Sequence, residues 1–382
     1  MNGDGKADIL IGAHNYNGIR GRAYLLYGGT SLTNTTLSGS ITGGVVFTGE
    51  VSGSQTGSSV SLGGDVNGDG YGDMLIGAIG INTVYLIYGG NALTSLTPSS
   101  LGTKGISIFG SSSMQFGYIV SLGGDVNGDG KADMLIGSPD LSSALGRVYL
   151  IYGGSSLSNI ATSTFTKSQG MVILGESVGS FSGLCVSIGG DVNKDRFADM
   201  LIGTKNGRAY LLFGDSESSL PQNISLAYLV NNTSPRGFKI QGQPTSASMA
   251  VSIGGDVNGD TYPDFLIGSS SDLSNRGRVY LLYGGPSLGN MDLSSLQPSQ
   301  GITIAGGSVN SFTGSAVCIG SDVNGDGYAD FIVASSGSQN TYLIYGGASL
   351  TNNAVTSGLT SSQGVVITRE STSIVTVSMN EM

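Results

Sequence analysis

The apolar positions of this chain fall in short runs of five to eight residues, separated by polar stretches rich in glycine, serine and threonine. One representative series is IVSLGG (119–124), DMLIG (133–137), RVYLIYGG (147–154) and GMVIL (170–174). Runs such as YLIY are apolar on both alternating faces of a strand, so both faces of the sheet must be buried. The pattern predicts four short strands, covered on both sides, in each series.

A nine-residue polar loop follows the first strand of the series and recurs along the chain. Its copies are DVNGDGYGD at 65–73, DVNGDGKAD at 125–133, DVNKDRFAD at 191–199, DVNGDTYPD at 256–264 and DVNGDGYAD at 322–330, with a shortened copy, MNGDGKAD, at 1–8. The complete copies begin 60 to 66 residues apart. Four-stranded repeats that cover one another predict an all-β fold, a β-propeller of about six four-stranded blades occupying residues 1–382 as a single domain. Each loop would join the first and second strands of its blade.

Oxygen-bearing side chains occupy positions one, three, five and nine of each complete loop, and intact copies have glycine at four and six. Calcium takes about six to eight oxygen ligands from a tightly bent backbone, so this spacing predicts several structural Ca²⁺ ions per chain. An EF-hand would carry glutamate at position twelve, where the loop at 65–73 leads to Ile76. The alternative is a solvated Asn-Gly turn between strands. Six copies with the same spacing favour the metal site.

The predicted ligands are the side-chain oxygens at positions one, three, five and nine and the backbone carbonyl at position seven. They are Asn2, Asp4 and Asp8 in the first copy; Asp65, Asn67, Asp69, Tyr71 and Asp73; Asp125, Asn127, Asp129, Lys131 and Asp133; Asp191, Asn193, Asp195, Phe197 and Asp199; Asp256, Asn258, Asp260, Tyr262 and Asp264; and Asp322, Asn324, Asp326, Tyr328 and Asp330.

The acidic charge is concentrated in these loops. The chain has 26 Asp and Glu against 16 Lys and Arg, which gives a net charge of −10 and a pI near 4.4. Three carboxylates in each of five complete loops, with Asp4 and Asp8, account for 17 of the 26. Carboxylates held this close repel one another and need a cation. The low pI is therefore largely a property of the metal-free chain.

The copies differ at position six, where three complete loops keep glycine and two carry Arg196 and Thr261. A residue with a side chain is strained in the turn conformation required there. We expect the three loops with both glycines to bind calcium most tightly. The loop at 191–199 should bind most weakly, because Lys194 and Arg196 also add positive charge.

Long and short repeats alternate. The distance from the start of a loop to the aromatic residue before the next glycine is 27 residues in one repeat and 22 or 23 in the following one. This alternation indicates a two-blade unit copied three times. The tail offers GVVIT (364–368), which matches GVVFT (44–48), and IVTVSM (374–379), which is similar to the strand before each loop. We expect the segment 364–379 to close the ring by pairing with the blade begun by residues 4–28; the alternative is a chain that starts and stops inside a longer array.

The segment 116–140, followed by GRVYLIYGG (146–154), resembles the FG-GAP repeat of integrin alpha-subunit propellers. Phe116 and Gly117 match the FG element, 137–139 match the GAP element, and the loop between them matches the calcium site of the family. The similarity extends over all six repeats. FG is replaced at 56–57, 182–183 and 313–314, and GAP at 77–79. The resemblance implies a propeller, calcium between the first two strands of a blade, and extracellular adhesion or ligand binding. Integrin propellers have seven blades and later leg domains, neither of which is visible here.

No catalytic constellation stands out, and we expect neither an enzyme nor a bound organic cofactor. His14, the only histidine, lies in a glycine- and asparagine-rich turn. Cys185 and Cys318 lie in small-residue strands of different repeats, which indicates small buried residues without a disulfide. No stretch of 18 apolar residues occurs, so we expect no membrane insertion by this segment, and no nucleic-acid partner.

The leading function is a non-enzymatic, extracellular or cell-surface module that binds a protein or glycan on one propeller face. The alternatives are a structural surface repeat and an accessory propeller of a secreted hydrolase. Sequons at Asn34, Asn223, Asn231 and Asn232 weakly favour an extracellular glycoprotein. The ligand-contacting candidates, or else ordinary solvated hairpin residues, are Tyr16, Arg20, Arg22, Arg276 and Arg278.

Overall fold

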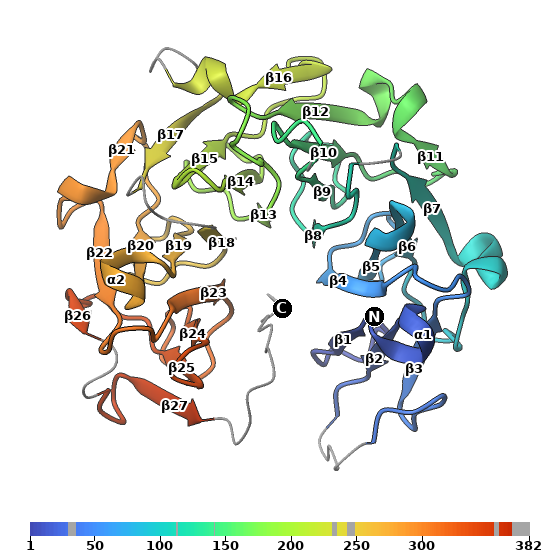
Figure 1. Cartoon of the computed structure of the whole chain (residues 1–382), viewed down its shortest axis with the longest axis horizontal. Helices are drawn as coiled ribbons and strands as arrows, with labels where there is room; N and C mark the ends of the chain where they lie inside the picture. The colour runs from blue at the N-terminus through green and yellow to red at the C-terminus, as the bar shows by residue number, and fades with distance from the viewer. Residues whose placement is uncertain are drawn as a thin grey trace. The chain divides into compact units, whose positions relative to one another are not determined.

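The computed structural model describes residues 1–29, 36–111, 114–140, 142–230, 235–242, 249–354 and 359–368. These residues form six antiparallel sheets in sequence order, coloured from blue to red in Figure 1. The fold is mostly β and its class is a six-bladed β-propeller. The chain divides into two compact units, Met1–Gly183 with Asp215–Ile224 and Leu184–Gly214 with Ser225–Met382. That residues 1–382 act as one domain stays a prediction.

The first unit contains three blades. Blade 1 consists of β1 (Ile9–Ala13), β2 (Arg22–Leu26) and β3 (Gly44–Thr48). Blade 2 consists of β4 (Thr56–Gly63), β5 (Asp73–Ala78), β6 (Thr83–Ile87) and β7 (Gly105–Phe109). Blade 3 consists of β8 (Ile119–Leu122), β9 (Met134–Ser138), β10 (Arg147–Ile151) and β12 (Gly170–Leu174).

The second unit contains the other three. Blade 4 consists of β13 (Cys185–Gly189), β14 (Asp199–Gly203), β15 (Arg208–Leu212) and β17 (Gly237–Gln241). Blade 5 consists of β18 (Met249–Ile253), β19 (Phe265–Ser269), β20 (Arg278–Leu282) and β22 (Gly301–Ala305). Blade 6 consists of β23 (Thr313–Ile319), β24 (Phe331–Ser335), β25 (Asn340–Ile344) and β27 (Gly364–Thr368). The four strands predicted per repeat are confirmed in blades 2 to 6.

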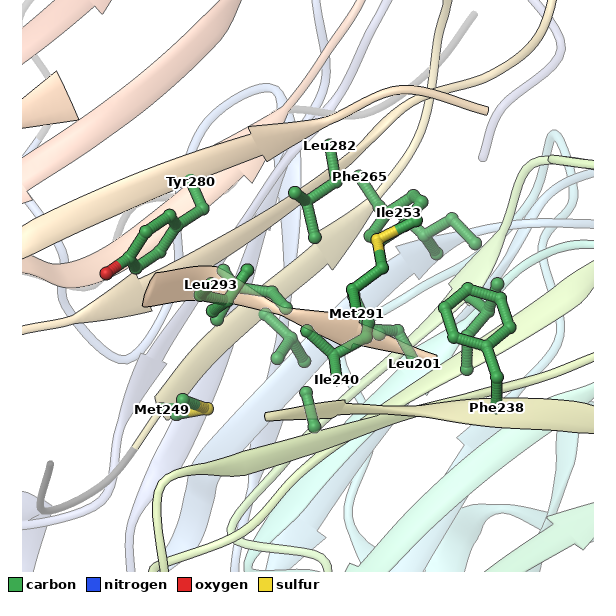
Figure 2. Close-up of a cluster of buried hydrophobic side chains, with 14 of the residues drawn as sticks. Leu201, Phe238, Ile240, Met249, Ile253, Phe265, Tyr280, Leu282, Met291 and Leu293 are labelled. Atoms are coloured by element: carbon green, nitrogen blue, oxygen red, sulfur yellow. The ribbon is translucent and has the colours of Figure 1, made fainter. Parts of the chain in front are cut away.

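Within each unit the cores lie between successive blades, as expected for strands that are apolar on both faces. Every residue of β5, β6, β9, β14 and β19 is buried. One core joins blades 4 and 5, where Leu201 and Ile240 of one blade pack with Phe265 and Tyr280 of the next. Figure 2 shows this cluster, in which Met291 enters from a segment outside the four strands of either blade.

The link between the second and third strands alternates in length from blade to blade. It spans 14–21, 139–146 and 270–277 in blades 1, 3 and 5, but 79–82, 204–207 and 336–339 in blades 2, 4 and 6. The long links contain the one-turn helices α1 (Tyr16–Ile19) and α2 (Asp272–Asn275) in blades 1 and 5, and the link 79–82 contains the 3₁₀ turn η1 (Ile79–Ile81). The predicted alternation therefore arises in this link.

The polar stretch between the third and fourth strands is more ordered than the sequence suggested. In each of the repeats 3 to 6 it contributes a two- or three-residue strand to the preceding blade, and these strands are β11 (Ile160–Ala161), β16 (Asn223–Ser225), β21 (Met291–Asp292) and β26 (Asn353–Ala354). Each of these short strands lies next to the fourth strand of that blade. In the three pairs whose register is described, the two strands are parallel. We call the whole polar stretch between the third and fourth strands of a repeat the strap. Short 3₁₀ turns accompany the straps, namely η2 (Pro98–Ser100), η3 (Gly102–Lys104), η4 (Thr162–Thr164), η5 (Lys167–Gln169), η6 (Leu226–Leu229) and η7 (Leu293–Ser295).

The predicted closing segment is only partly described. Gly364–Thr368 forms β27, which pairs with β25 as the fourth strand of blade 6, so the expectation that this part of the segment pairs with the blade begun by residues 4–28 is wrong. Residues 374–379 lie outside the described residues, so closure through them stays a prediction. Within the part of the chain that the structure describes, no helix is long and apolar enough to span a membrane.

Candidate metal-binding loops

The acidic loops lie between the first and second strands of their blades, as the sequence analysis predicted. In blades 2 to 6 each loop joins the innermost strand to the second strand; the loop at 65–73, for example, leaves β4 and ends at the first residue of β5. In blade 1 the shortened copy precedes β1. The position-nine aspartate therefore sits at the entrance to a buried strand, and positions one to six form the turn outside it.

The position-one carboxylate organises that turn. Asp65 Oδ1 accepts hydrogen bonds from the backbone N–H groups of Gly68 (2.7 Å) and Asp69 (3.1 Å), and its Oδ2 accepts one from Gly70 (2.7 Å). The loops at 125–133, 256–264 and 322–330 repeat all three bonds. A carboxylate has about four acceptor sites, so each of these aspartates keeps capacity for a further partner.

The position-nine carboxylate fastens the loop to the sheet. Asp73 is fully buried; its Oδ2 accepts a hydrogen bond from Val66 N–H and its Oδ1 accepts one from Gly89 N–H, both at 2.8 Å. Gly89 follows β6, so one side chain joins the loop to the end of the third strand. The equivalent glycines are Gly28, Gly153, Gly214, Gly284 and Gly346.

These glycines are functional residues that sequence reasoning missed. A Cβ on Gly89 would overlap the carbonyl oxygen of Gly72, so only glycine can bring its N–H to Asp73. The same obstruction exists at Gly153, where a Cβ would lie 2.5 Å from the carbonyl oxygen of Ala132, the residue equivalent to Gly72. The available signal was the glycine pair that follows the third strand in most repeats.

Burial perturbs the position-nine carboxyl groups strongly in the metal-free chain. Desolvation raises the pKa of Asp73, Asp133 and Asp264 to about 7 and that of Asp199 to about 8. It also raises the pKa of Asp330. The two backbone N–H bonds oppose the rise, while the carboxylates at positions one and five add repulsion. Such groups bind either a proton or a compensating cation.

The donor set fits calcium in type. Asp65, Asn67 and Asp69 present hard oxygen atoms on one exposed or half-exposed turn. These atoms currently serve the loop itself: Asn67 Nδ2 donates to Asp69 Oδ2 at 2.9 Å, and Tyr71 N–H donates to Asp69 Oδ1 at 2.9 Å. Across the described residues, no three Asp, Glu, His or Cys side chains are gathered closely enough to hold a metal. Binding would therefore require the side chains at positions one, three and five to draw closer together around the ion.

The two loops that lack glycine at position six have the strained backbone that their sequences predicted. Arg196 and Thr261 adopt φ of +81° and +77°, the left-handed region in which a Cβ is strained. Lys194 has φ of +60°, and its N–H donates to the Asp191 carbonyl rather than to the carboxylate. Its ammonium reaches the next loop, where it contacts the Thr261 hydroxyl and lies 4.4 Å from the Tyr262 ring centre. Its charge therefore affects two loops.

Neighbouring loops pack on each other through position seven. A Cβ on Gly3 would lie 2.7 Å from the Tyr71 ring, and one on Gly259 would overlap the Tyr328 ring. Glycine at position four is thus required by the side chain of the next loop as well as by its own positive φ, which is +82° at Gly259. The sequence suggested only the position-seven carbonyl as a ligand; this side-chain contact was not foreseen.

Comparison with known families agrees with this repeat. The FG-GAP repeat family matches residues 56–86, 116–151, 249–282 and 313–346, one match in each of blades 2, 3, 5 and 6. The chain is an FG-GAP repeat protein. It has the integrin alpha-like β-propeller fold and is distantly related to integrin alpha subunits.

Several curated proteins are similar to this FG-GAP protein. Integrin alpha-5 of Xenopus laevis is 30% identical over 251 residues, 61% of this chain and 21% of the relative. Integrin alpha-3 of Cricetulus griseus is 30% identical over 166 residues, 41% of this chain and 14% of the relative. Phosphatidylinositol-glycan-specific phospholipase D of Bos taurus is 28% identical over 160 residues, 38% of this chain and 17% of the relative. The matches thus span about a fifth or less of these relatives.

The FG position of the FG-GAP protein differs between Phe116, which follows a short link, and Thr56 and Thr313, which follow long links. Phe116 is fully buried and its N–H donates to Asn82 of the short link before it, at 3.2 Å. After the long links the ring is replaced by a buried hydroxyl residue: Thr56 bridges Gly21, and Thr313 bridges Gly277. A Cβ on Gly21 would overlap the Thr56 backbone, so the two segments touch directly. At these two positions the small hydroxyl residue leaves room for the backbone of the long link.

The candidate ligand-contacting residues of the long hairpins fall into two groups. Arg22 stacks on the ring of Tyr16, with 3.6 Å between the guanidinium carbon and the ring centre. Arg278 lies 3.5 Å from Asp272 and is half-buried. Arg20 and Arg276 are exposed. The first two are held within their own hairpins, whereas the side chains of the last two are exposed to solvent.

The remaining candidates are one histidine, two cysteines and the asparagines of the sequons. His14 is exposed in the first long link. Cys185 and Cys318, which the sequence suggested are small buried residues, are half-buried, and these two described cysteines are not joined by a disulfide. Burial raises the pKa of the Cys185 thiol to about 11, so it stays protonated near neutrality. The Asn223 side chain is exposed, while Asn34, Asn231 and Asn232 lie outside the described residues.

Proposed function

We propose that this FG-GAP protein is a calcium-binding, non-enzymatic adhesion or ligand-binding propeller that works outside the cell or on its surface. The observation that supports calcium binding most directly is the buried position-nine carboxyl group, joined on one side to its loop and on the other to the end of the third strand. A group of this kind gives the loop a negative interior that a divalent cation would neutralise.

The residues of each loop would contribute different ligands to the bound calcium ion. Asp65, Asn67 and Asp69 would supply exposed oxygen ligands, the Tyr71 carbonyl a fifth, and Asp73 the carboxyl group that fastens the ion to the sheet. The ion supplies charge neutralisation and holds the turn closed. Because it would bind the folded chain and not the unfolded one, it would raise the free energy of unfolding by mass action.

Thermal unfolding with 2 mM CaCl₂ and with excess chelator tests this proposal. We expect a higher Tm with calcium, and a smaller gain for Asp65→Asn, which removes one charge from an intact loop without changing its shape. Glu217→Gln is the matched control, because Glu217 is an exposed acid outside the loops. Equal Tm values with calcium and with chelator would refute the metal proposal.

Integrin alpha relatives support the adhesion part of the proposal. Protein and glycan arrays, probed with and without calcium, would identify the ligand class. We expect Arg20→Ala or Arg276→Ala to weaken binding, and Lys104→Ala, an exposed cation outside the long hairpins, to leave it unchanged. Absence of any array ligand in calcium would favour the purely structural surface repeat.

The match to phosphatidylinositol-glycan-specific phospholipase D favours a second candidate, an accessory propeller of a secreted hydrolase. On that alternative the propeller would position a catalytic segment that lies elsewhere. Phosphodiester hydrolysis by the purified 382-residue chain would contradict the non-enzymatic proposal. Specific binding of a phospholipid-linked glycan without turnover would support the accessory role.

A further inference from the structure

Four of the acidic loops carry the dipeptide Asn-Gly at positions three and four, namely at 67–68, 127–128, 258–259 and 324–325. In this dipeptide the backbone nitrogen of the glycine reaches the preceding side-chain amide most easily, because no Cβ obstructs its approach. Attack there closes a cyclic imide and releases ammonia. The same dipeptide also occurs at 2–3, 17–18 and 206–207. The surroundings of each copy therefore decide how readily it reacts.

The attacking nitrogen in the loop at 65–73 already faces a carboxylate. Gly68 N–H donates to Asp65 Oδ1 at 2.7 Å. The equivalent bonds in the other three loops, from Gly128, Gly259 and Gly325, measure 2.6 to 2.7 Å. A carboxylate in this position can take the proton as the nitrogen forms a new bond, which is general-base catalysis. Each of these glycines thus has a base in place.

The amide under attack is held by the residue at position five. Asn67 Oδ1 accepts a hydrogen bond from Asp69 N–H at 3.0 Å, and Asn67 Nδ2 donates to Asp69 Oδ2 at 2.9 Å. The bond from the position-five N–H to the asparagine Oδ1 measures 2.8 to 3.0 Å in the other three loops. A backbone N–H on this oxygen stabilises the negative charge that develops there during attack. The loop therefore supplies both a base and an oxyanion donor.

Other asparagines of the chain lack parts of this arrangement. In the loop at 191–199, Asn193 is followed by Lys194, whose N–H donates to the Asp191 carbonyl and not to the carboxylate. Asn17 and Asn206 precede glycine but have no acidic residue two positions before or after them. The chain thus contains its own references for the dipeptide without the loop and for the loop without the dipeptide.

We propose that the four Asn-Gly loops are self-modification sites, in which the position-three asparagine becomes aspartate or isoaspartate. The residues converted are Asn67, Asn127, Asn258 and Asn324.

The step is balanced within the loop and solvent. At 65–73 a bond forms between Gly68 N and Asn67 Cγ, and the Cγ–Nδ2 bond breaks. Asp65 takes the Gly68 proton, and a proton returned through solvent leaves with Nδ2 as ammonia. Water then opens the imide at either carbonyl carbon. No metal takes part, so the step does not depend on the proposed calcium site.

Exposure should order the four sites, because opening of the imide needs water. Asn324 is exposed, Asn67 and Asn258 are half-buried, and Asn127 is 6% exposed. We expect Asn324 to become an acid first and Asn127 last. Each conversion adds a carboxylate to an acidic loop, and isoaspartate also lengthens the backbone of the turn. A chain kept without metal would therefore accumulate altered loops.

Peptide mapping by mass spectrometry tests the proposal. In the folded full chain, kept at neutral pH with excess chelator, Asn67, Asn258 and Asn324 should convert at least about tenfold faster than Asn17 and Asn206. Asn17 is exposed, so poor access to water would not explain its slower conversion. In chain unfolded by urea these rates should become similar, because the loop contacts are lost.

Two substitutions separate the base from the dipeptide. Asp65→Asn keeps an acceptor beside Gly68 but removes the base, and should slow conversion of Asn67 about tenfold. Asn324, in another loop of the same molecule, should keep its rate. Lys194→Gly places the missing glycine after Asn193 and should start conversion there.

Three results would overturn the proposal. Loop asparagines that convert no faster than Asn17 and Asn206 would show that the loop contacts give no assistance. A rate at Asn67 that Asp65→Asn leaves unchanged would remove the base. A preference for the loops that persists in urea would assign it to the local sequence and not to the folded loop. Should Asp65→Asn fail to fold, an Asn193 that stays unconverted in Lys194→Gly would contradict the proposal instead.

Discussion

The Gly89 N–H donates a 2.8 Å hydrogen bond to the Asp73 carboxylate, which joins the end of the third strand of blade 2 to the beginning of its second strand. The other Asp73 oxygen accepts Val66 N–H of the acidic loop. Loop and hairpin are therefore connected through one buried side chain. A change in the charge or position of that carboxyl group must therefore affect the structure of both the loop and the hairpin.

Gly89→Ala should destabilise the protein. The added Cβ would overlap the Gly72 carbonyl oxygen, so the chain must move and weaken the bond to Asp73. We expect a loss of about 1–3 kcal/mol in the free energy of unfolding, measured by urea denaturation. Gly29→Ala is the control, because nothing lies within 4 Å of a Cβ there, and it should stay within about 0.5 kcal/mol of the parent. Equal effects of the two variants would count against the steric argument.

The fold could be predicted from the sequence because its signals are local and repeated. Apolar runs such as YLIY predicted the buried strands, and the number of copies of the recurring loop predicted the number of blades. The straps could not be predicted, since the strand that follows Asn159 has only two residues, Ile160 and Ala161, and lies in a stretch that is mostly polar. Their order comes from the edge that they cover and not from their own hydrophobicity. The bond between Gly89 and Asp73 was hidden for a related reason: it is a contact between positions sixteen residues apart.

The candidate loops were also only partly predictable. The spacing of Asp65, Asn67 and Asp69 identified the oxygen set, and the strain at Arg196 followed from its missing glycine. The burial of Asp73 was not foreseen, because it depends on the strand that the residue enters. The reach of Lys194 to the next loop likewise depends on how two loops lie side by side.

Removing the unusual residues of the fourth loop should strengthen it. The double substitution Lys194→Gly and Arg196→Gly relieves two left-handed non-glycine residues, worth about 1–2 kcal/mol each, and removes two positive charges. We expect calcium affinity at this loop to rise at least about tenfold in a calorimetric titration. Lys131→Gly in the loop at 125–133, which removes a cation but no strain, should produce a smaller gain. A double variant with unchanged affinity would contradict the ranking of the loops.

The metal-free protein should become less stable as pH rises toward neutrality. A carboxyl group whose folded pKa is raised, from 3.8 to about 7 at Asp73 and about 8 at Asp199, holds a proton in the folded chain that the unfolded chain releases. Its contribution is fully present below about pH 4 and is lost as pH rises through 7 to 8. With excess chelator, Tm should therefore fall between pH 5 and pH 8.

Calcium should reverse this trend, because protons and the cation compete for the same carboxyl groups. Asp133→Asn, which is neutral at every pH, should flatten the metal-free profile. Melting curves at several pH values, with calcium and with chelator, provide the comparison. A metal-free Tm that rises steadily from pH 5 to pH 8 would show that the buried carboxyl groups are ionised throughout.

Asn159→Ala should loosen the strap on blade 2. The substitution leaves the Ser107 N–H without its 2.9 Å acceptor, which costs about 1–2 kcal/mol for a group at a covered edge. Faster hydrogen exchange at Ser107 is the specific readout. Asn91→Ala, at an exposed position in another strap, is the control and should change neither stability nor exchange by a measurable amount. Normal protection of Ser107 in Asn159→Ala would mean that the strap is held by other contacts.

The pairing of long hairpins with hydroxyl residues restricts how the gene can gain or lose repeats. Thr56 accommodates the long link of blade 1 through its bridge to Gly21, and Phe116 accommodates the short link of blade 2 through Asn82. A recombination event that deletes blade 2 alone would bring the long link of blade 1 against the phenylalanine ring and place a large side chain where two backbones must touch. Deletion of blades 2 and 3 together would instead bring that link against Ser182, a small hydroxyl residue like Thr56. Unequal crossing-over that removes both blades should therefore be tolerated better than loss of blade 2 by itself.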